Sequence, residues 1–320
     1  MASESSTISE RIDFQSIFSK LGSARLVGIQ LPDGLKYYAG EIADRFRENG
    51  YEVIISGKPS YGACDIDVSL LEVADVLLHF GHTEMLSIER VIYVPYNIDY
   101  SVDAELLRRE IKEKRIAIIG TASYAWKFES VAERLRDVGF EVELRKGKRV
   151  AYPGQVLGCN YSCLEGTRAK AILFIGDGEF HAIGASLYAG RRVYAYSPLS
   201  EELRVVDTSD FVRRRYFQVS RAKMCDSFAI LVSTKPGQKR LGLAMRLKRL
   251  AEEKGIKAEV ILADEIDPSL VEGFRFDCYV STACPRIAYD DYRRFSKPVI
   301  TPQEFEIVLG LSEELTLDLL

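Results

Sequence analysis

A strand–helix–strand pattern occurs three times along this chain, and it constrains the fold more than any other feature. Each copy opens with an apolar run, continues into an amphipathic segment and reaches a glycine that precedes a second apolar run. The opening apolar runs are residues 25–31, 115–120 and 228–232. A repeat of this kind indicates one supersecondary unit used three times, so we expect three related parts.

Two more apolar runs follow in each copy. The third runs are residues 74–80, 171–175 and 277–281, and the fourth are 91–95, 192–196 and 298–302. Short apolar strands that alternate with helices are typical of parallel sheets covered on both faces. We therefore predict an α/β fold of three pseudo-repeated units, each a four-stranded parallel sheet flanked by helices, arranged around a central site. The expected boundaries are 1–110, 111–215 and 216–320.

The segments between the strands predict helices. In the first copy, apolar residues from Leu35 to Phe46 recur at helical spacing and form one stripe. A further helix, from Thr208 to Asp226, is expected to link the second and third units. It carries five basic residues, which fit either a solvated face or a contact with an anion or a partner. These are Arg213, Arg214, Arg215, Arg221 and Lys223.

Composition excludes several classes of protein. The 320 residues carry a net charge of −4, which argues against a broad nucleic-acid surface. No apolar run approaches the roughly 20 residues that span a bilayer, and the polar N-terminus has no signal-peptide core. We therefore expect a cytoplasmic protein without a membrane segment. In that reducing compartment, the six cysteines are expected to be buried, metal-bound or reactive in preference to disulfide-paired.

Three cysteines follow strands at positions where ligands bind in open parallel sheets. Cys64, Cys159 and Cys284 come from the three different copies, each beside small or turn-forming residues. Three thiolates suit an iron–sulfur cluster with one open iron, and three cysteines with water also suit zinc. Spacing alone fits three buried structural cysteines equally well. It also leaves Cys163 as a rival to Cys159, because both lie in one loop.

The remaining cysteines and the three histidines give weaker signals. Cys278 lies within a predicted strand, and Cys225 closes the linking helix. His79 is also within a strand, whereas His82 and His181 follow third strands, where either a hydrogen-bonded or a ligand-binding role is possible. The chain has no Walker A motif, no Gly-x-Gly-x-x-Gly fingerprint and no Cys-x-x-x-Cys-x-x-Cys signature.

Six ordered motifs between Gln30 and Arg286 resemble the archaeal type of diphthamide biosynthesis enzyme, a 2-(3-amino-3-carboxypropyl)histidine synthase. The motifs are Gln-Leu-Pro-Asp-Gly-Leu from residue 30, Tyr-Gly-Ala-Cys-Asp from 61, Gln-Val-Leu-Gly-Cys-Asn from 155, Gly-Asp-Gly-Glu-Phe-His from 176, Thr-Lys-Pro-Gly-Gln from 234 and Ser-Thr-Ala-Cys-Pro-Arg from 281. The Gly-Cys-Asn match selects Cys159 over Cys163.

The resemblance implies a homodimer with a 4Fe–4S cluster on Cys64, Cys159 and Cys284 and S-adenosylmethionine at the open iron. With an external electron donor, such enzymes cut the sulfur–Cγ bond of S-adenosylmethionine. They transfer the 3-amino-3-carboxypropyl group to a histidine of translation elongation factor 2. Candidate residues for holding S-adenosylmethionine lie in the loops that follow the strands. They are Gln30, Asp33, Gly34, Asp177, Gly178, His181, Lys235 and Gln238.

Two alternatives stay open at this point. Quinolinate synthase resembles the same architecture of three α/β units with one cluster cysteine each, although the wording of the motifs favours the diphthamide enzyme. A non-catalytic iron–sulfur partner subunit is the second alternative, and the three intact cysteine positions argue against it.

Overall fold

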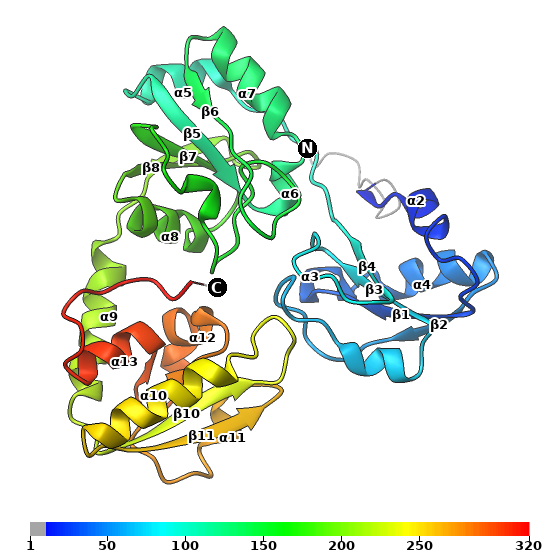
Figure 1. Cartoon of the computed structure of the whole chain (residues 1–320). Helices are drawn as coiled ribbons and strands as arrows, with labels where there is room; N and C mark the ends of the chain where they lie inside the picture. The colour runs from blue at the N-terminus through cyan, green and yellow to red at the C-terminus, as the bar shows by residue number, and fades with distance from the viewer. Residues whose placement is uncertain (1–10, 320) are drawn as a thin grey trace. The chain divides into compact units, whose positions relative to one another are not determined.

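The computed structural model describes residues 11–319, which form two compact units (Figure 1). Of the described residues, the first unit comprises 11–156, 162–177 and 194–204. The second unit comprises 157–161, 178–193 and 205–319. The α/β prediction is confirmed, since the described residues contain three sheets with parallel pairing and flanking helices.

All three sheets share one strand order. The first sheet runs β2-β1-β3-β4, the third runs β11-β10-β12-β13, and the second runs β6-β5-β7-β8 with β9 added at its edge. The bounds in the first sheet are β1 Leu26–Gln30, β2 Glu52–Ile55, β3 Val76–Phe80 and β4 Val91–Val94. Those in the second are β5 Arg115–Gly120, β6 Glu141–Glu143, β7 Ala171–Ile175, β8 Arg192–Ser197 and β9 Glu202–Val205. Those in the third are β10 Ser227–Ser233, β11 Lys257–Ala263, β12 Cys278–Ser281 and β13 Val299–Ile300.

Helices connect the strands in the pattern that the repeat predicts. The α-helices are α2 Phe14–Phe18, α3 Asp33–Lys36, α4 Ala39–Glu48, α5 Ala104–Glu110, α6 Ala122–Ala125, α7 Phe128–Asp137, α8 Phe180–Ala189, α9 Ser209–Ala222, α10 Leu241–Glu253, α11 Pro268–Val271, α12 Pro285–Tyr289 and α13 Pro302–Val308. The described residues also contain three short 3-10 helices, which are η1 Val68–Glu72, η2 Ser162–Leu164 and η3 Asp291–Arg294. None of the helices among residues 11–319 is long and apolar enough to cross a membrane.

Each sheet packs its apolar residues against one long helix, which is α4, α7 or α10 in the three sheets. In the first, Phe46 of α4 is fully buried among β-strand residues such as Val27 and Leu78. In the second, Phe128 and Leu135 of α7 pack in the same way. In the third, Leu247 of α10 is fully buried, and α10, yellow in Figure 1, lies against β10 and β11. The apolar stripes seen in the sequence therefore face the sheets.

The shared strand order fixes where ligands are expected. In each sheet, the second strand lies on one side of the first strand, and the third and fourth strands lie on its other side. The switch point therefore lies between the first and third strands of each sheet, and ligands bind beyond their carboxyl ends. In the first sheet, these ends are Gln30 of β1 and Phe80 of β3.

Four local predictions were wrong. The helix expected from Leu35 to Phe46 is broken at Tyr37–Tyr38 into α3 and α4. The second sheet has a fifth strand, β9. The linking helix ends at Ala222, four residues earlier than expected. Cys225 and Cys278 form a disulfide with a Cα–Cα distance of 6.1 Å, because the turn after α9 meets the start of β12.

Candidate functional site

The loop that carries Cys64 connects β2 to η1 and is closed by its own hydrogen bonds. The buried Asp65 carboxylate accepts a hydrogen bond from the Tyr61 backbone N–H at 3.1 Å. The Asp65 N–H donates to the carbonyl of Gly62 at 2.9 Å. Cys64 is half-buried and lies outside the disulfide. The turn-forming residues of the motif therefore fold the loop around the cysteine.

Gln30, the last residue of β1, is fully buried and contacts this loop. Its Nε2 donates to the Asp65 carbonyl at 2.9 Å, and its Oε1 accepts from the Asp67 N–H at 3.0 Å. His79 Nδ1 lies 2.8 Å from the same Oε1. The side chain predicted to hold the cosubstrate therefore lies beneath the cysteine loop.

His79 and His82 form a stacked pair, with ring centroids 4.9 Å apart and His82 Nδ1 3.0 Å from His79 Nε2. Burial, followed by the neighbouring His82, lowers the pKa of His79 to about 3. Burial also lowers the pKa of His82 to about 4. Both rings are therefore neutral near pH 7, which fits the hydrogen-bonded alternative for His82.

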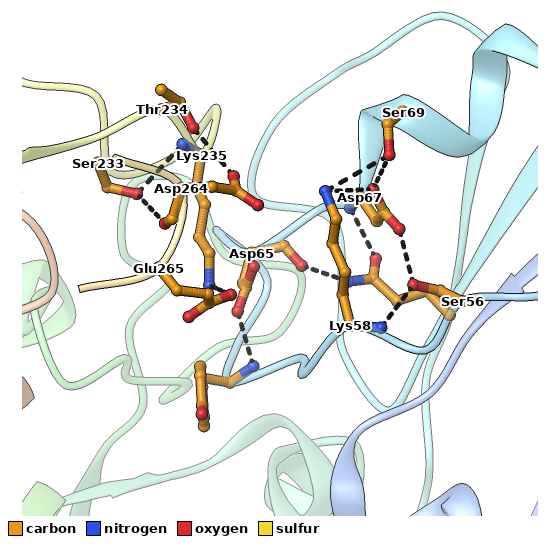
Figure 2. A network of polar contacts seen from close by, with 12 residues as sticks. Ser56, Lys58, Asp65, Asp67, Ser69, Ser233, Thr234, Lys235, Asp264 and Glu265 are labelled. Carbon is orange, nitrogen blue, oxygen red and sulfur yellow. Dashed lines mark hydrogen bonds and ion pairs between the residues drawn. The ribbon is translucent and has the colours of Figure 1, made fainter. Parts of the chain in front are cut away.

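Asp67 anchors the far end of the loop (Figure 2). Its carboxylate accepts hydrogen bonds from Ser56 at 2.7 Å and from Ser69 at 2.5 Å, and Lys58 Nζ lies 3.1 Å away. Burial raises the pKa of Asp67, but the hydrogen bonds of Ser69, Ser56 and Lys58 outweigh that effect and hold the pKa below its ordinary value. The loop thus ends on an ionised, buried carboxylate.

Cys159 and Cys284 both belong to the second unit, and Phe180 joins their loops. Cys159 lies in the turn 157–160, which closes through a hydrogen bond from the Asn160 N–H to the Leu157 carbonyl at 2.9 Å. The Phe180 ring packs so closely on Gly158 that a Cβ there would lie 2.2 Å from Cε1. The same ring lies 4.8 Å from the guanidinium carbon of Arg286. Phe180 was missed as a site residue, although it lies within the Gly-Asp-Gly-Glu-Phe-His motif.

Arg240 supports the backbone that leads to Cys284. Its guanidinium donates to the carbonyls of Thr282 at 2.6 Å and Ala283 at 2.9 Å, and it pairs with the buried Asp318 at 2.5 Å. Cys284 itself is half-buried and directly precedes α12. No motif identified Arg240, because its role depends on Asp318, which is 78 residues further along the chain.

Lys235 and Gln238 lie in one turn after β10, and both are buried. Lys235 Nζ lies 2.6 Å from a carboxylate oxygen of Glu265, in the loop after β11 (Figure 2). The flanking residues fix this turn, since Ser233 Oγ accepts from the Lys235 N–H at 3.2 Å and Thr234 Oγ1 lies 2.9 Å from an Asp264 carboxylate oxygen. The turn thus presents a buried cation at the carboxyl end of the third sheet.

Asp177, Gly178 and His181, the candidates that follow β7, differ in exposure and in hydrogen bonding. The Asp177 carboxylate accepts hydrogen bonds from Tyr124 and, at 2.7 Å, from Ser197. Gly178 is exposed and has a φ of +78°. His181 is half-buried, and its pKa is lowered to about 4 by burial and then by Arg286.

Asp33 and Gly34 lie in the first turn of α3, beyond the end of β1. Both are exposed, and Asp33 pairs with Lys36 at 2.7 Å. A side chain at Gly34 would meet no atom within 4 Å. These two residues are therefore accessible to a ligand at the carboxyl end of β1, unlike Gln30.

The predicted ligand set involves both units. Cys64 belongs to the first unit, and Cys159 and Cys284 belong to the second. Within residues 11–319, no three His, Cys, Asp or Glu side chains are gathered in an arrangement that holds a metal ion. Cys163 is buried, and burial raises the pKa of its thiol to about 12. The three-cysteine site stays a prediction at this point.

Arg215 is not part of a basic surface, contrary to the alternative that grouped it with its neighbours on the linking helix. It is 1% exposed, and its guanidinium binds both carboxylate oxygens of the buried Glu304, at 2.7 and 2.6 Å. It also donates to the carbonyls of Ala288 and Val299. Arg213 and Arg214 are exposed, so they keep the two interpretations offered for this helix face.

Comparisons with known proteins all point to one family. The family model described as "Putative diphthamide synthesis protein" matches residues 31–318. The 2-(3-amino-3-carboxypropyl)histidine synthase of Pyrococcus horikoshii is 38% identical over 309 residues, which cover 93% of this chain and 90% of that protein. The 2-(3-amino-3-carboxypropyl)histidine synthase subunit 1 of Encephalitozoon cuniculi is 33% identical over 89% of this chain and 84% of that protein.

A solved structure agrees with these relatives. The crystal structure of Dph2 from Pyrococcus horikoshii with a 4Fe–4S cluster matches with a TM-score of 0.90 and 37% identity, covering 96% of this chain and 93% of that one. A second crystal structure of the same Dph2 matches with a TM-score of 0.89. Since the matches extend over nearly the whole chain, this chain belongs to the family of diphthamide synthesis proteins.

Proposed function

We propose that this chain is a 2-(3-amino-3-carboxypropyl)histidine synthase. It transfers the 3-amino-3-carboxypropyl group of S-adenosylmethionine to a histidine of translation elongation factor 2, the first step of diphthamide biosynthesis. The observation that carries the proposal is the 38% identity, over nearly all of both chains, to the Pyrococcus horikoshii protein of that name. The family match also favours this activity over that of a quinolinate synthase.

The chemistry of the available thiols supports a 4Fe–4S cluster on Cys64, Cys159 and Cys284. Cys225 and Cys278 are joined in a disulfide, and the raised pKa of Cys163 disfavours the thiolate that binds iron. The three others lie in loops that follow strands or precede a helix, and the related Dph2 was solved with such a cluster. Three thiolates leave one iron open to a cosubstrate. When bound, the cluster supplies the electron that breaks the sulfur–Cγ bond.

The chain's own residues then orient the cosubstrate, and this orientation decides which carbon is released. Lys235 and Gln238 hold the methionine carboxylate, since they supply a buried cation and a buried amide in one turn. The exposed backbone of Gly178 adds donors, with Asp177 and His181 beside it, and Asp33 and Gly34 hold the ribose or amino group. Release of the aminocarboxypropyl group leaves methylthioadenosine as the second product.

The partners of the reaction follow from its chemistry. A protein substrate, elongation factor 2, presents the acceptor histidine on an accessible loop, and an external donor supplies the electron. We propose that the chain works as a homodimer in the cytoplasm. Arg213 and Arg214 of α9 are the candidate contacts for the protein substrate, because they are exposed and basic.

Single cysteine variants test the proposed cluster. Cys64→Ala, Cys159→Ala and Cys284→Ala are each expected to lose the brown sulfur-to-iron charge-transfer colour after anaerobic reconstitution, since each removes one ligand. Cys163→Ala is the matched control, because it lies four residues from Cys159 and is expected to keep its iron. Iron and sulfide assays provide the measurement. A colourless Cys163→Ala protein beside a brown Cys159→Ala protein would reverse the ligand assignment.

A further inference from the structure

Gln30 has the contacts of a structural brace and not those of a ligand-binding residue. It lies at the carboxyl end of β1 and is 0% exposed. Its Oε1 accepts two hydrogen bonds, from the Asp67 N–H and from His79, which uses both lone pairs of that oxygen. Its Nε2 donates to the Asp65 carbonyl. The side chain therefore holds the backbone on the C-terminal side of Cys64 at two points, Asp65 and Asp67.

The backbone partners of Gln30 fix which way its amide points, and the amide in turn fixes the proton of His79. The Asp67 N–H can only donate and the Asp65 carbonyl can only accept, so the oxygen and nitrogen of the amide are assigned. His79 must then carry its proton on Nδ1, and its Nε2 accepts from Nδ1–H of His82. The donors thus run in one direction, from His82 through His79 to Gln30.

Tyr93 of β4 contacts the residue on the other side of Cys64. Its hydroxyl lies 3.5 Å from the Ala63 carbonyl and donates to the Leu86 carbonyl at 2.9 Å. The Tyr93 ring packs edge-on against His79, with centroids 5.3 Å apart. The residues on both sides of Cys64 are therefore in contact with one group of side chains from β1, β3 and β4, of which Gln30 and His79 are fully buried and Tyr93 is half-buried.

We propose that Gln30, supported by His79 and His82, is a positioning residue that holds the Cys64 loop in the conformation in which the Cys64 thiolate binds iron. This assignment replaces the sequence-based prediction that Gln30 contacts the cosubstrate. It rests on the proposed function for the identity of the bound metal. The bracing of the loop depends only on the contacts of the first unit. Loss of the brace is expected to loosen Cys64 alone among the cysteines.

The test compares Gln30→Met with Gln218→Met in the full chain prepared without iron. Methionine keeps the shape of glutamine and removes its hydrogen bonds, and Gln218 is a buried glutamine on α9. Iodoacetamide labelling followed by mass spectrometry gives a rate for each cysteine. In Gln30→Met, labelling of Cys64 is expected to accelerate about tenfold, while Cys159 and Cys284 keep their wild-type rates. Gln218→Met is expected to leave Cys64 unchanged.

A second variant keeps the proposal testable if Gln30→Met does not fold. His79→Phe retains the ring against Tyr93 and removes the donor to Gln30, so it should accelerate Cys64 labelling in the same direction by a smaller factor. Wild-type labelling of Cys64 in either folded variant would overturn the proposal, as would equal acceleration at all three cysteines. A wild-type chain that fails to bind iron would instead contradict the proposed function, because the labelling assay needs no cluster.

Discussion

All three histidines of this chain are kept neutral by burial, and two of them lie beneath the Cys64 loop. The folded pKa values of His79 and His82 are about 3 and about 4, below the ordinary value of 6.5. A neutral pair can keep one fixed direction of hydrogen bonding, which protonation of either ring would break. The pair is therefore suited to a structural role at neutral pH and not to a proton-transfer role.

This burial predicts that acid destabilises the fold. Between pH 6.5 and about 4, the histidines bind protons in the unfolded chain but not in the folded one. Lowering the pH therefore lowers the free energy of unfolding, by up to about 1.4 kcal/mol per pH unit for each histidine. Urea unfolding of the iron-free chain at pH 7, 6 and 5 measures the slope. His82→Gln is expected to reduce it. Constant stability from pH 7 to 5 would contradict the assignment of buried, neutral rings.

Among the charge pairs of α9, the Arg215–Glu304 pair should lose the most unfolding free energy when one partner is removed. Removing Arg215 leaves a carboxylate uncompensated in the core, so Arg215→Ala is expected to cost about 3–5 kcal/mol of unfolding free energy. Arg213→Ala is the matched control, because the Arg213 side chain is 79% exposed and its pair with Asp210 should contribute less than about 1 kcal/mol. Urea unfolding compares the two variants, and equal stabilities would refute the burial of Arg215.

At the scale of elements, the loops of Cys159 and Cys284 depend on the first residue of α8. The Phe180 ring fills the space above Gly158 and reaches Arg286, two residues after Cys284. One aromatic side chain thus sets the separation of two loops that come from distant parts of the sequence. This arrangement explains why glycine precedes Cys159, since any larger residue would displace the ring.

Gly158→Ala therefore tests the packing of these two loops. The added methyl group would collide with Phe180, so we expect a loss of about 1–3 kcal/mol of unfolding free energy and a lower iron content after reconstitution. Gly40→Ala serves as the control, because a Cβ at this position in α4 meets nothing within 4 Å. Thermal unfolding and iron assays report both effects. A Gly158→Ala protein with full iron content and wild-type stability would exclude the proposed contact.

The elements that the sequence failed to predict leave no mark on its apolar pattern. Strand β9 alternates weakly and is largely exposed, so no apolar run marks Glu202–Val205. At the break, Tyr37 keeps right-handed helical angles and Tyr38 has a φ of −94° and a ψ of 9°, while the apolar stripe continues through the segment. In contrast, strands such as β7 are buried on both faces and were predicted at their observed bounds. The apolar pattern of the sequence therefore predicts the buried elements and misses the exposed ones.

At the scale of the whole molecule, three copies of one strand order arise from three copies of one sequence pattern. The repeat places the motifs at the carboxyl ends of the strands, and that much could be predicted. The direction of a side chain could not. Gln30 ends β1 and Asp33 follows it by three residues, yet Gln30 is buried against a loop and Asp33 is exposed. Pairing across long separations, as in Cys225–Cys278, is likewise not encoded in any local pattern.

The most direct test of the central claim is the identity of the nucleoside that the reaction releases. The chain, purified without oxygen and supplied with a reductant, S-adenosylmethionine and intact elongation factor 2, should form methylthioadenosine in step with a 3-amino-3-carboxypropyl group on the factor. Chromatography and mass spectrometry measure the two products. Formation of mainly 5′-deoxyadenosine, or no transfer by a chain that holds its full cluster, would contradict the account.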